Sequence, residues 1–133
     1  MNTIVIDATN ATLGRLASYA AKQALLGKSV VIVNCSEAII SGKRPDILEK
    51  YRTRRARGGS GLKGPHFPKQ PFRLVKRTIR GMLSYKQKRG EDALKRIMCH
   101  DKVPTEHEAA KKILAGKEKR TTVIKLSKLS KEI

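Results

Sequence analysis

Hydrophobic residues in the first third of the chain follow two different spacings. The runs Ile4–Ile6 and Val30–Val33 are continuously apolar, as in strands that are covered on both faces. Between them, over Leu13–Leu25, apolar residues recur every three or four positions, which is the spacing of one helix face. Gly27 is a natural end for this helix. The pattern predicts a strand–helix–strand unit with parallel strands, because the connection is long enough for a crossover.

The rest of the chain predicts shorter elements. Ile39 and Ile40 form a brief apolar step, and Pro45 suits the first turn of a helix that runs through Ile47, Leu48 and Tyr51. A clear helix is predicted to start at Pro71, with an apolar stripe of Phe72, Val75, Ile79 and Met82 or Leu83. Further predictions are helices over Gly90–Met98 and His107–Leu114, a strand over Thr121–Leu126 and an amphipathic segment over Leu126–Ile133.

Glycine and proline interrupt this pattern over residues 57–71. Four glycines and three prolines in this stretch are incompatible with regular structure, so a loop is predicted there. A loop of that length in a compact domain is usually functional or disordered. The 133 residues suit one domain, residues 1–133, and the basic loop 52–71 is expected to lie within it. The expected fold is α/β, a parallel sheet flanked by helices in three layers (α/β/α).

Positive charge changes this picture from a fold to a function class. The chain has 30 Lys and Arg against 11 Asp and Glu, a net charge of +19. Fourteen of the 30 basic residues, and none of the 11 acidic ones, lie in residues 50–90. A surface that only needs solubility mixes both signs, whereas a run of one sign indicates a phosphate-binding surface. The expected partner is a nucleic acid.

The candidate RNA-binding residues are the basic side chains in and beside this run. Arginine can bridge two phosphate oxygens, and glycine lets the backbone approach a phosphate closely. With only two Phe, three Tyr and no Trp, the composition favours a folded RNA surface over a single strand. Tyr51 and Phe67 could each stack on a base or pack in the core. The candidate residues are Lys43, Arg44, Arg52, Arg54, Arg55, Arg57, Lys63, His66, Lys69, Arg73, Lys76, Arg77, Arg80, Lys86, Lys88 and Arg89.

Other chemistry finds little support in the sequence. Gly27-Lys28-Ser29 resembles the end of a phosphate-binding P-loop, but it lacks the preceding glycine and stands between a helix and a strand. Cys35 and Cys99 are read as two buried thiols, and the Cys99-His100 pair has no second pair to complete a metal site. Asp7 and Asp101 are interpreted as caps or ion-pair partners. We therefore expect no catalytic residue, metal or cofactor.

The N-terminal and central blocks of the sequence resemble a known family. Val5-Ile-Asp-Ala, Leu13-Gly-Arg-Leu-Ala-Ser, Lys28-Ser-Val-Val-Ile-Val-Asn and Ile40-Ser-Gly are similar to the opening of the universal large-subunit ribosomal protein L13 family. Arg77-Thr-Ile-Arg-Gly-Met-Leu, Lys88-Arg-Gly and Ala93-Leu-Lys-Arg resemble its central signature, in an archaeal form. The resemblance implies a structural protein of the large subunit that binds ribosomal RNA and neighbouring ribosomal proteins and has no catalytic residues.

Two other functions remain open at this point. One is a nucleotide- or RNA-modifying enzyme built on an α/β sheet. The other is an RNA-binding regulator that acts off the ribosome; charge alone does not separate it from a ribosomal protein. The N-terminus has no basic segment before a long apolar stretch, and no run is long enough to cross a membrane. We therefore expect a cytoplasmic protein without membrane or small-molecule partners.

Overall fold

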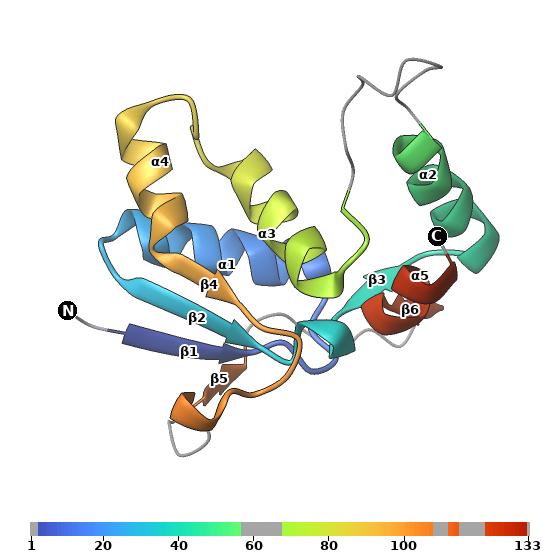
Figure 1. The fold of residues 1–133 in the computed structure, drawn as a ribbon, viewed down its shortest axis with the longest axis horizontal. Helices are drawn as coiled ribbons and strands as arrows, with labels where there is room; N and C mark the ends of the chain where they lie inside the picture. The colour runs from blue at the N-terminus through green and yellow to red at the C-terminus, as the bar shows by residue number, and fades with distance from the viewer. Residues whose placement is uncertain (1–2, 57–67, 108–111, 115–121, 133) are drawn as a thin grey trace.

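Strands and helices alternate along the first half of the chain, and further short elements follow. The computed structural model describes residues 3–56, 68–107, 112–114 and 122–132 (Figure 1). Its elements are β1 (Thr3–Asp7), α1 (Leu13–Leu25), β2 (Ser29–Val33), the 3-10 helix η1 (Cys35–Glu37), β3 (Ile39–Ser41), α2 (Arg44–Ala56), α3 (Pro71–Met82), α4 (Lys88–Lys95), β4 (Ile97–Cys99), the 3-10 helix η2 (Thr105–His107), β5 (Lys112–Leu114), β6 (Val123–Lys125) and α5 (Leu126–Glu132).

A parallel sheet with the strand order β4-β2-β1-β5 forms the centre of the fold. In β1 and β2, Val5 lies opposite Val31 and Ile6 lies opposite Ile32. A second, antiparallel sheet pairs β3 with β6. The predicted α/β class, the parallel strand–helix–strand unit and the strand within 121–126 are confirmed.

The two faces of the parallel sheet have different cover. Ile6, Val30, Ile32 and Ile97 point toward α1, α3 and α4 and are fully buried. On the opposite face, Val5, Val31 and Val33 pack against Val103, which follows β4 in the chain. Figure 1 shows α1, α3 and α4 together on one side of the sheet. Within the described ranges, α-helices therefore cover one face of the sheet. No α-helix of these ranges covers the other face, where the predicted three-layer arrangement places its third layer.

Helix α1 is narrow on its buried side. Ala17, Ala20 and Ala24 are fully buried there, and their small side chains let α3 and the sheet approach closely. The helix ends as predicted at Gly27, whose φ of +94° is the left-handed conformation that glycine adopts without strain. The Lys28 amide then donates to the Gln23 carbonyl at 3.2 Å, which closes the helix end.

Helix α3 begins at Pro71, as predicted, and its first turn is capped from a distant part of the chain. The carboxylate Oδ1 of Asp101 accepts a hydrogen bond from the Phe72 amide at 2.9 Å. This contact confirms the interpretation of Asp101 as a cap. The buried stripe differs in part from the prediction. Leu74, which the prediction omitted, is buried, and Met82 is 45% exposed.

Two predicted helices are wrong in part. The helix that begins near Gly90 ends at Lys95, and the next residues form strand β4, with Met98 opposite Val31. Residues 112–114, predicted as helix, form strand β5 beside β1. In both cases pairing with a distant strand outweighs the local helical spacing.

Helix α2 belongs to a small lobe with β3, β6 and α5 at one end of the parallel sheet (Figure 1). Leu126 and Leu129 of α5 are fully buried, and Lys125 pairs with Glu37 at 2.6 Å. Helix α2 continues to Ala56, so the first residues of the predicted loop 52–71 are helical, which corrects that boundary.

Candidate nucleic-acid interface

Four cations of α3 project from the side opposite its buried residues. They recur at the three- and four-residue spacing that puts side chains on one helix face. Together with one residue before α3 and one on α4, they line a shallow groove of about 370 Å³, which we call the α3 groove. None of these lining residues is acidic. Its lining residues are Pro68, Arg73, Lys76, Arg77, Arg80 and Leu94.

The turn between α3 and α4 depends on Gly90. A Cβ atom added to Gly90 would overlap the carbonyl of Ser84 and come within 2.9 Å of its nitrogen. The absence of a side chain therefore lets the start of α4 fold back onto the end of α3. The Gln87 amide donates to the Ser84 carbonyl at 2.9 Å and tightens the same turn. This geometry explains why a glycine follows Lys88 and Arg89 in the sequence.

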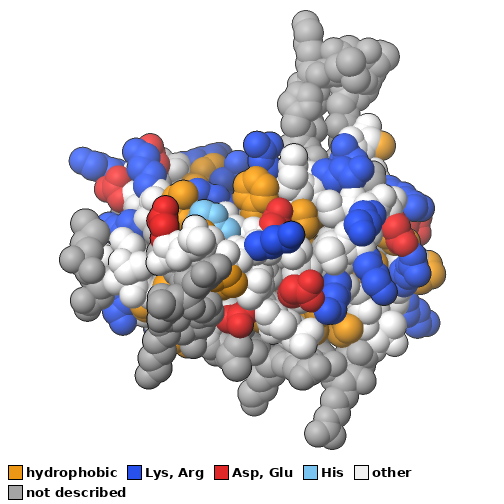
Figure 2. Space-filling model, turned by 60° about the horizontal axis from the view of Figure 1, so that its bottom comes forward, with side chains coloured by type: hydrophobic (Ala, Val, Ile, Leu, Met, Phe, Trp, Pro, Cys, Tyr) orange, Lys and Arg blue, Asp and Glu red, His pale blue; other side chains and the backbone are white. Residues whose placement is uncertain are grey.

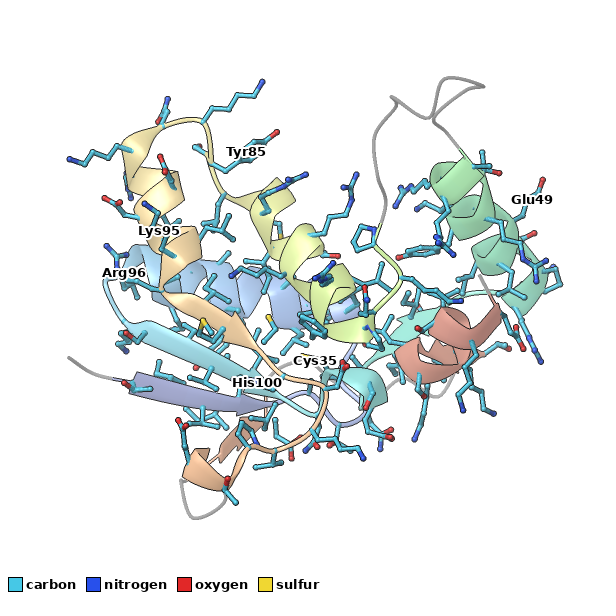
Figure 3. All side chains as sticks on the ribbon, viewed as in Figure 1. Cys35, Glu49, Tyr85, Lys95, Arg96 and His100 are labelled. Carbon is cyan, nitrogen blue, oxygen red and sulfur yellow. The ribbon has the colours of Figure 1, made fainter. Side chains whose placement is uncertain are left out.

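This turn adds more exposed cations to the same end of the molecule. The side chains of Lys86, Lys88 and Arg89 are exposed. The guanidinium carbon of Arg80 lies 5.0 Å from the centroid of the Tyr85 ring, a cation–π distance. Tyr85 is labelled in Figure 3. The contact of Tyr85 was not predicted, because a lone aromatic residue five positions after an arginine is too weak a sequence signal.

Arg44 and Arg52, the first two predicted RNA-binding arginines of α2, contact α5. The guanidinium of Arg44 forms an ion pair with the carboxylate of Glu132. Arg52 donates two hydrogen bonds, of 3.2 and 3.0 Å, to the backbone carbonyl of Glu132. Positive charge is favourable at a helix C-terminus, where carbonyl groups lack helical partners. Arg44 and Arg52 therefore join α2 to α5, a role that their sequence positions do not reveal.

Tyr51 is a packing residue, which settles one alternative. It is 9% exposed and belongs to the hydrophobic core. Burial raises the pKa of its hydroxyl above the ordinary value, and the nearby charge of Arg54 acts in the opposite direction. The Arg54 guanidinium carbon lies 5.6 Å from the centroid of the Tyr51 ring. The ring therefore supports Arg54 and is not exposed for stacking on a base.

The remaining predicted residues divide into exposed cations and residues outside the described ranges. Lys43 precedes α2, Arg55 lies near its end, and Lys69 precedes α3; all three are exposed. Arg57, Lys63, His66 and the aromatic Phe67 lie outside the described residues. The structure thus brings the four α3 cations into one groove. Arg44 and Arg52, by contrast, lie on α2 and contact α5. Pro68 and Leu94, which complete the α3 groove, were not predicted.

The cysteines and isolated carboxylates have structural surroundings. Cys35 and Cys99 are buried free thiols, as predicted. The hydrogen bond between their side chains and burial both raise the pKa of the Cys35 thiol, so it stays protonated. The Asp7 carboxylate accepts hydrogen bonds from the Thr9 amide at 3.0 Å and from Asn34 at 3.1 Å. These groups order the loops that follow β1 and β2.

The lower side of the molecule, as Figure 1 is drawn, has mixed charge. Figure 2, in which the lower side of Figure 1 is turned forward, shows acidic and basic side chains interspersed. Over the residues that the structure describes, no group of three or more His, Cys, Asp or Glu side chains could hold a metal ion. No helix in the same ranges is long and apolar enough to cross a membrane. The α3 groove, whose described lining residues include four cations and no acidic residue, is therefore the clearest candidate site for an anionic ligand.

Comparison of the sequence with known proteins supports the family resemblance that the central sequence block indicates. Residues 1–106 match the family model described as ribosomal protein L13. "Large ribosomal subunit protein uL13" of Methanosarcina barkeri is 53% identical over 103 residues, which cover 77% of this chain and 73% of the relative. The protein of the same name in Thermoplasma volcanium is 41% identical over 133 residues, covering 97% and 96%. A third, from Picrophilus torridus, is 41% identical over 131 residues, covering 96% and 94%. The chain belongs to the ribosomal protein L13 family, with relatives of archaeal type.

Proposed function

We propose that this protein is a structural constituent of the large ribosomal subunit and binds folded ribosomal RNA through the α3 groove and the exposed cations beside it. The observation that carries the proposal is the set of four α3 cations on one helix face, with no acidic side chain among the described residues that line the groove. Membership of the L13 family supports the ribosomal part of the proposal. The role is binding and not catalysis.

The physical basis of binding is the neutralisation of phosphate charge. Each cation that contacts a phosphate releases counterions from the RNA, so affinity falls steeply as the salt concentration rises. Three of the four α3 cations are arginines, namely Arg73, Arg77 and Arg80. The planar guanidinium group of an arginine can bridge two phosphate oxygens. Because α3 is anchored by Leu74, Val75 and Ile79, its cations are held on a rigid element. A rigid cationic face recognises the shape of a folded RNA surface.

Neighbouring ribosomal proteins would contact the protein within the particle, and the particle would lie in the cytoplasm. Sedimentation tests this directly: a cell lysate is washed with high salt and separated on a sucrose gradient. The protein is expected to remain with large subunits. A protein that sediments as a small free species even at low salt would contradict the ribosomal role and favour a regulator that acts off the ribosome.

A second experiment tests the site. Replacing Arg73, Lys76 and Arg80 together by Glu reverses three charges in the α3 groove, and none of these residues is fully buried. The variant is expected to lose affinity for large-subunit RNA in filter binding while keeping its circular dichroism spectrum. A matched triple variant, Lys22, Lys128 and Lys131 to Glu, makes the same charge change on the exposed surfaces of α1 and α5. Equal losses in the two triple variants would show that only net charge matters and would refute the site.

A further inference from the structure

A second groove lies between α2 and α3. Its volume is about 210 Å³, and we call it the α2–α3 groove. Arg77 lines both this groove and the α3 groove, so the two grooves adjoin at one side chain. The residues that line the α2–α3 groove are Tyr51, Arg54, Leu74, Arg77, Thr78 and Gly81.

Two guanidinium groups from different helices reach this groove. Arg54 comes from the last turns of α2 and is positioned over the ring of Tyr51, whereas Arg77 comes from the middle of α3. The described lining residues include no carboxylate. Glu49, the acidic residue of α2 nearest in sequence to Arg54, points away from α3 (Figure 3). The arrangement places two positively charged side chains at one groove, and this favours an anionic ligand there.

The floor of the groove is apolar. Leu74 is 1% exposed and Tyr51 is 9% exposed, so the floor consists of side chains of the hydrophobic core. A charge pair beside such a floor is screened less than one on an open surface. The Thr78 hydroxyl donates to the Leu74 carbonyl at 2.9 Å, which fixes its hydrogen away from the groove. The polar hydrogens that the groove offers an anion therefore come mainly from the two arginines.

The size of the groove limits the ligand. Pockets that enclose whole small molecules usually measure about 300–1,000 Å³, so a space of about 210 Å³ is too small for a complete nucleotide. We infer that the α2–α3 groove binds a single backbone phosphate of the ribosomal RNA, held from two sides by the guanidinium groups of Arg54 and Arg77. This inference rests on the proposed function, since it adds one defined contact to the RNA-binding surface.

Gly81 allows the groove to be filled without disturbing the fold. A Cβ atom added to Gly81 meets nothing within 4 Å, and the residue is exposed on α3. The variant Gly81→Leu is therefore expected to fold normally and to place its side chain at the mouth of the groove. Gly14→Leu, on α1, is the matched control, because a Cβ there also meets nothing within 4 Å. In filter binding with large-subunit RNA, Gly81→Leu is expected to weaken affinity about tenfold and Gly14→Leu to leave it unchanged.

The two arginines test whether one phosphate is shared. Arg54→Ala and Arg77→Ala are each expected to weaken binding about tenfold and to reduce the slope of log affinity against log salt by about one. If Arg54 and Arg77 bind the same phosphate, the double variant should reduce the slope of log affinity against log salt by about one and not two. Its loss of affinity should also be smaller than the product of the two single losses.

The outcomes separate this inference from the proposed function. If the wild-type protein does not bind the RNA with strong salt dependence, the proposed function itself fails. If the wild type binds, but Gly81→Leu binds equally well and the arginine losses multiply, the shared phosphate is refuted while the proposed function stands. If Gly81→Leu binds naked RNA normally but enters large subunits poorly, the groove holds an acidic side chain of a neighbouring protein, and the inference is overturned.

Discussion

Gly90 gives a test in which local propensity and packing predict opposite signs. It lies within α4, where replacing glycine by alanine normally stabilises a helix by about 0.5–1 kcal/mol. At Gly90, however, the added Cβ overlaps the backbone carbonyl of Ser84. A backbone group cannot rotate away as a side chain can, so the α3–α4 turn must shift. Overpacking of this kind costs about 1–3 kcal/mol, and we take about 3 because the obstacle is backbone.

The expected net effect of Gly90→Ala is therefore a loss of about 2 kcal/mol in the free energy of unfolding. For a chain of 133 residues this corresponds to a melting temperature lower by about 6–10 °C. Thermal unfolding followed by circular dichroism measures the change. Gly81→Ala is the matched control on α3, where an added Cβ meets nothing, and it should stabilise the protein by about 0.5 kcal/mol. A melting temperature for Gly90→Ala at or above that of the wild type would refute the packing argument.

Three further predictions concern the cap, the core and the thiol. Asp101→Ala removes the acceptor of the Phe72 amide and should lower the free energy of unfolding by about 1 kcal/mol in urea titrations, whereas Asp101→Asn, which keeps an acceptor oxygen, should lose less. Val75→Asp should abolish cooperative thermal unfolding because Val75 is fully buried, while its neighbour variant Lys76→Asp should melt normally and bind large-subunit RNA more weakly; a normal melt for Val75→Asp would contradict the placement of that helix face. Because the folded-state pKa of Cys35 is raised above its ordinary value of 9.0, the unfolded chain alone loses this proton above that pH, so stability should be level below pH 9 and fall by up to about 1.4 kcal/mol per pH unit above it. The decline should be shallower in Cys35→Ala, and identical slopes in urea titrations from pH 7 to 10 would exclude the thiol as its source.

The elements that the sequence predicted well are those whose spacing is long and whose partners are near in the chain. Over α1 the apolar spacing persists for more than three turns, and Gly27 marks the end in the sequence and in the backbone. The run Val30–Val33 pairs with β1, the strand nearest before it. The four α3 cations were also predictable, because they share a helix whose start at Pro71 is clear.

The elements that the sequence did not predict depend on distant partners. Ile97 continues the helical spacing of α4, yet the pairing of residues 97–99 with β2 makes them a strand. Likewise, β5 is a strand because it pairs with β1, more than 100 residues earlier in the chain. The contacts of Arg44 and Arg52 with Glu132 span 80 residues or more and leave no local pattern. Charge runs indicate which residues are basic, but not which of them are engaged within the fold.

The small lobe has a consequence for the order in which the protein can fold during synthesis. Strand β3 and helix α2 emerge from the ribosome early, but β3 pairs with β6, and α2 is joined to α5 by contacts such as Arg44–Glu132, which spans 88 residues. The parallel core of β1, α1 and β2 can form from neighbouring segments well before then. Helix α2 therefore reaches its final place only after residues 122–132 have been translated, so the side of the protein that carries Arg54 matures last.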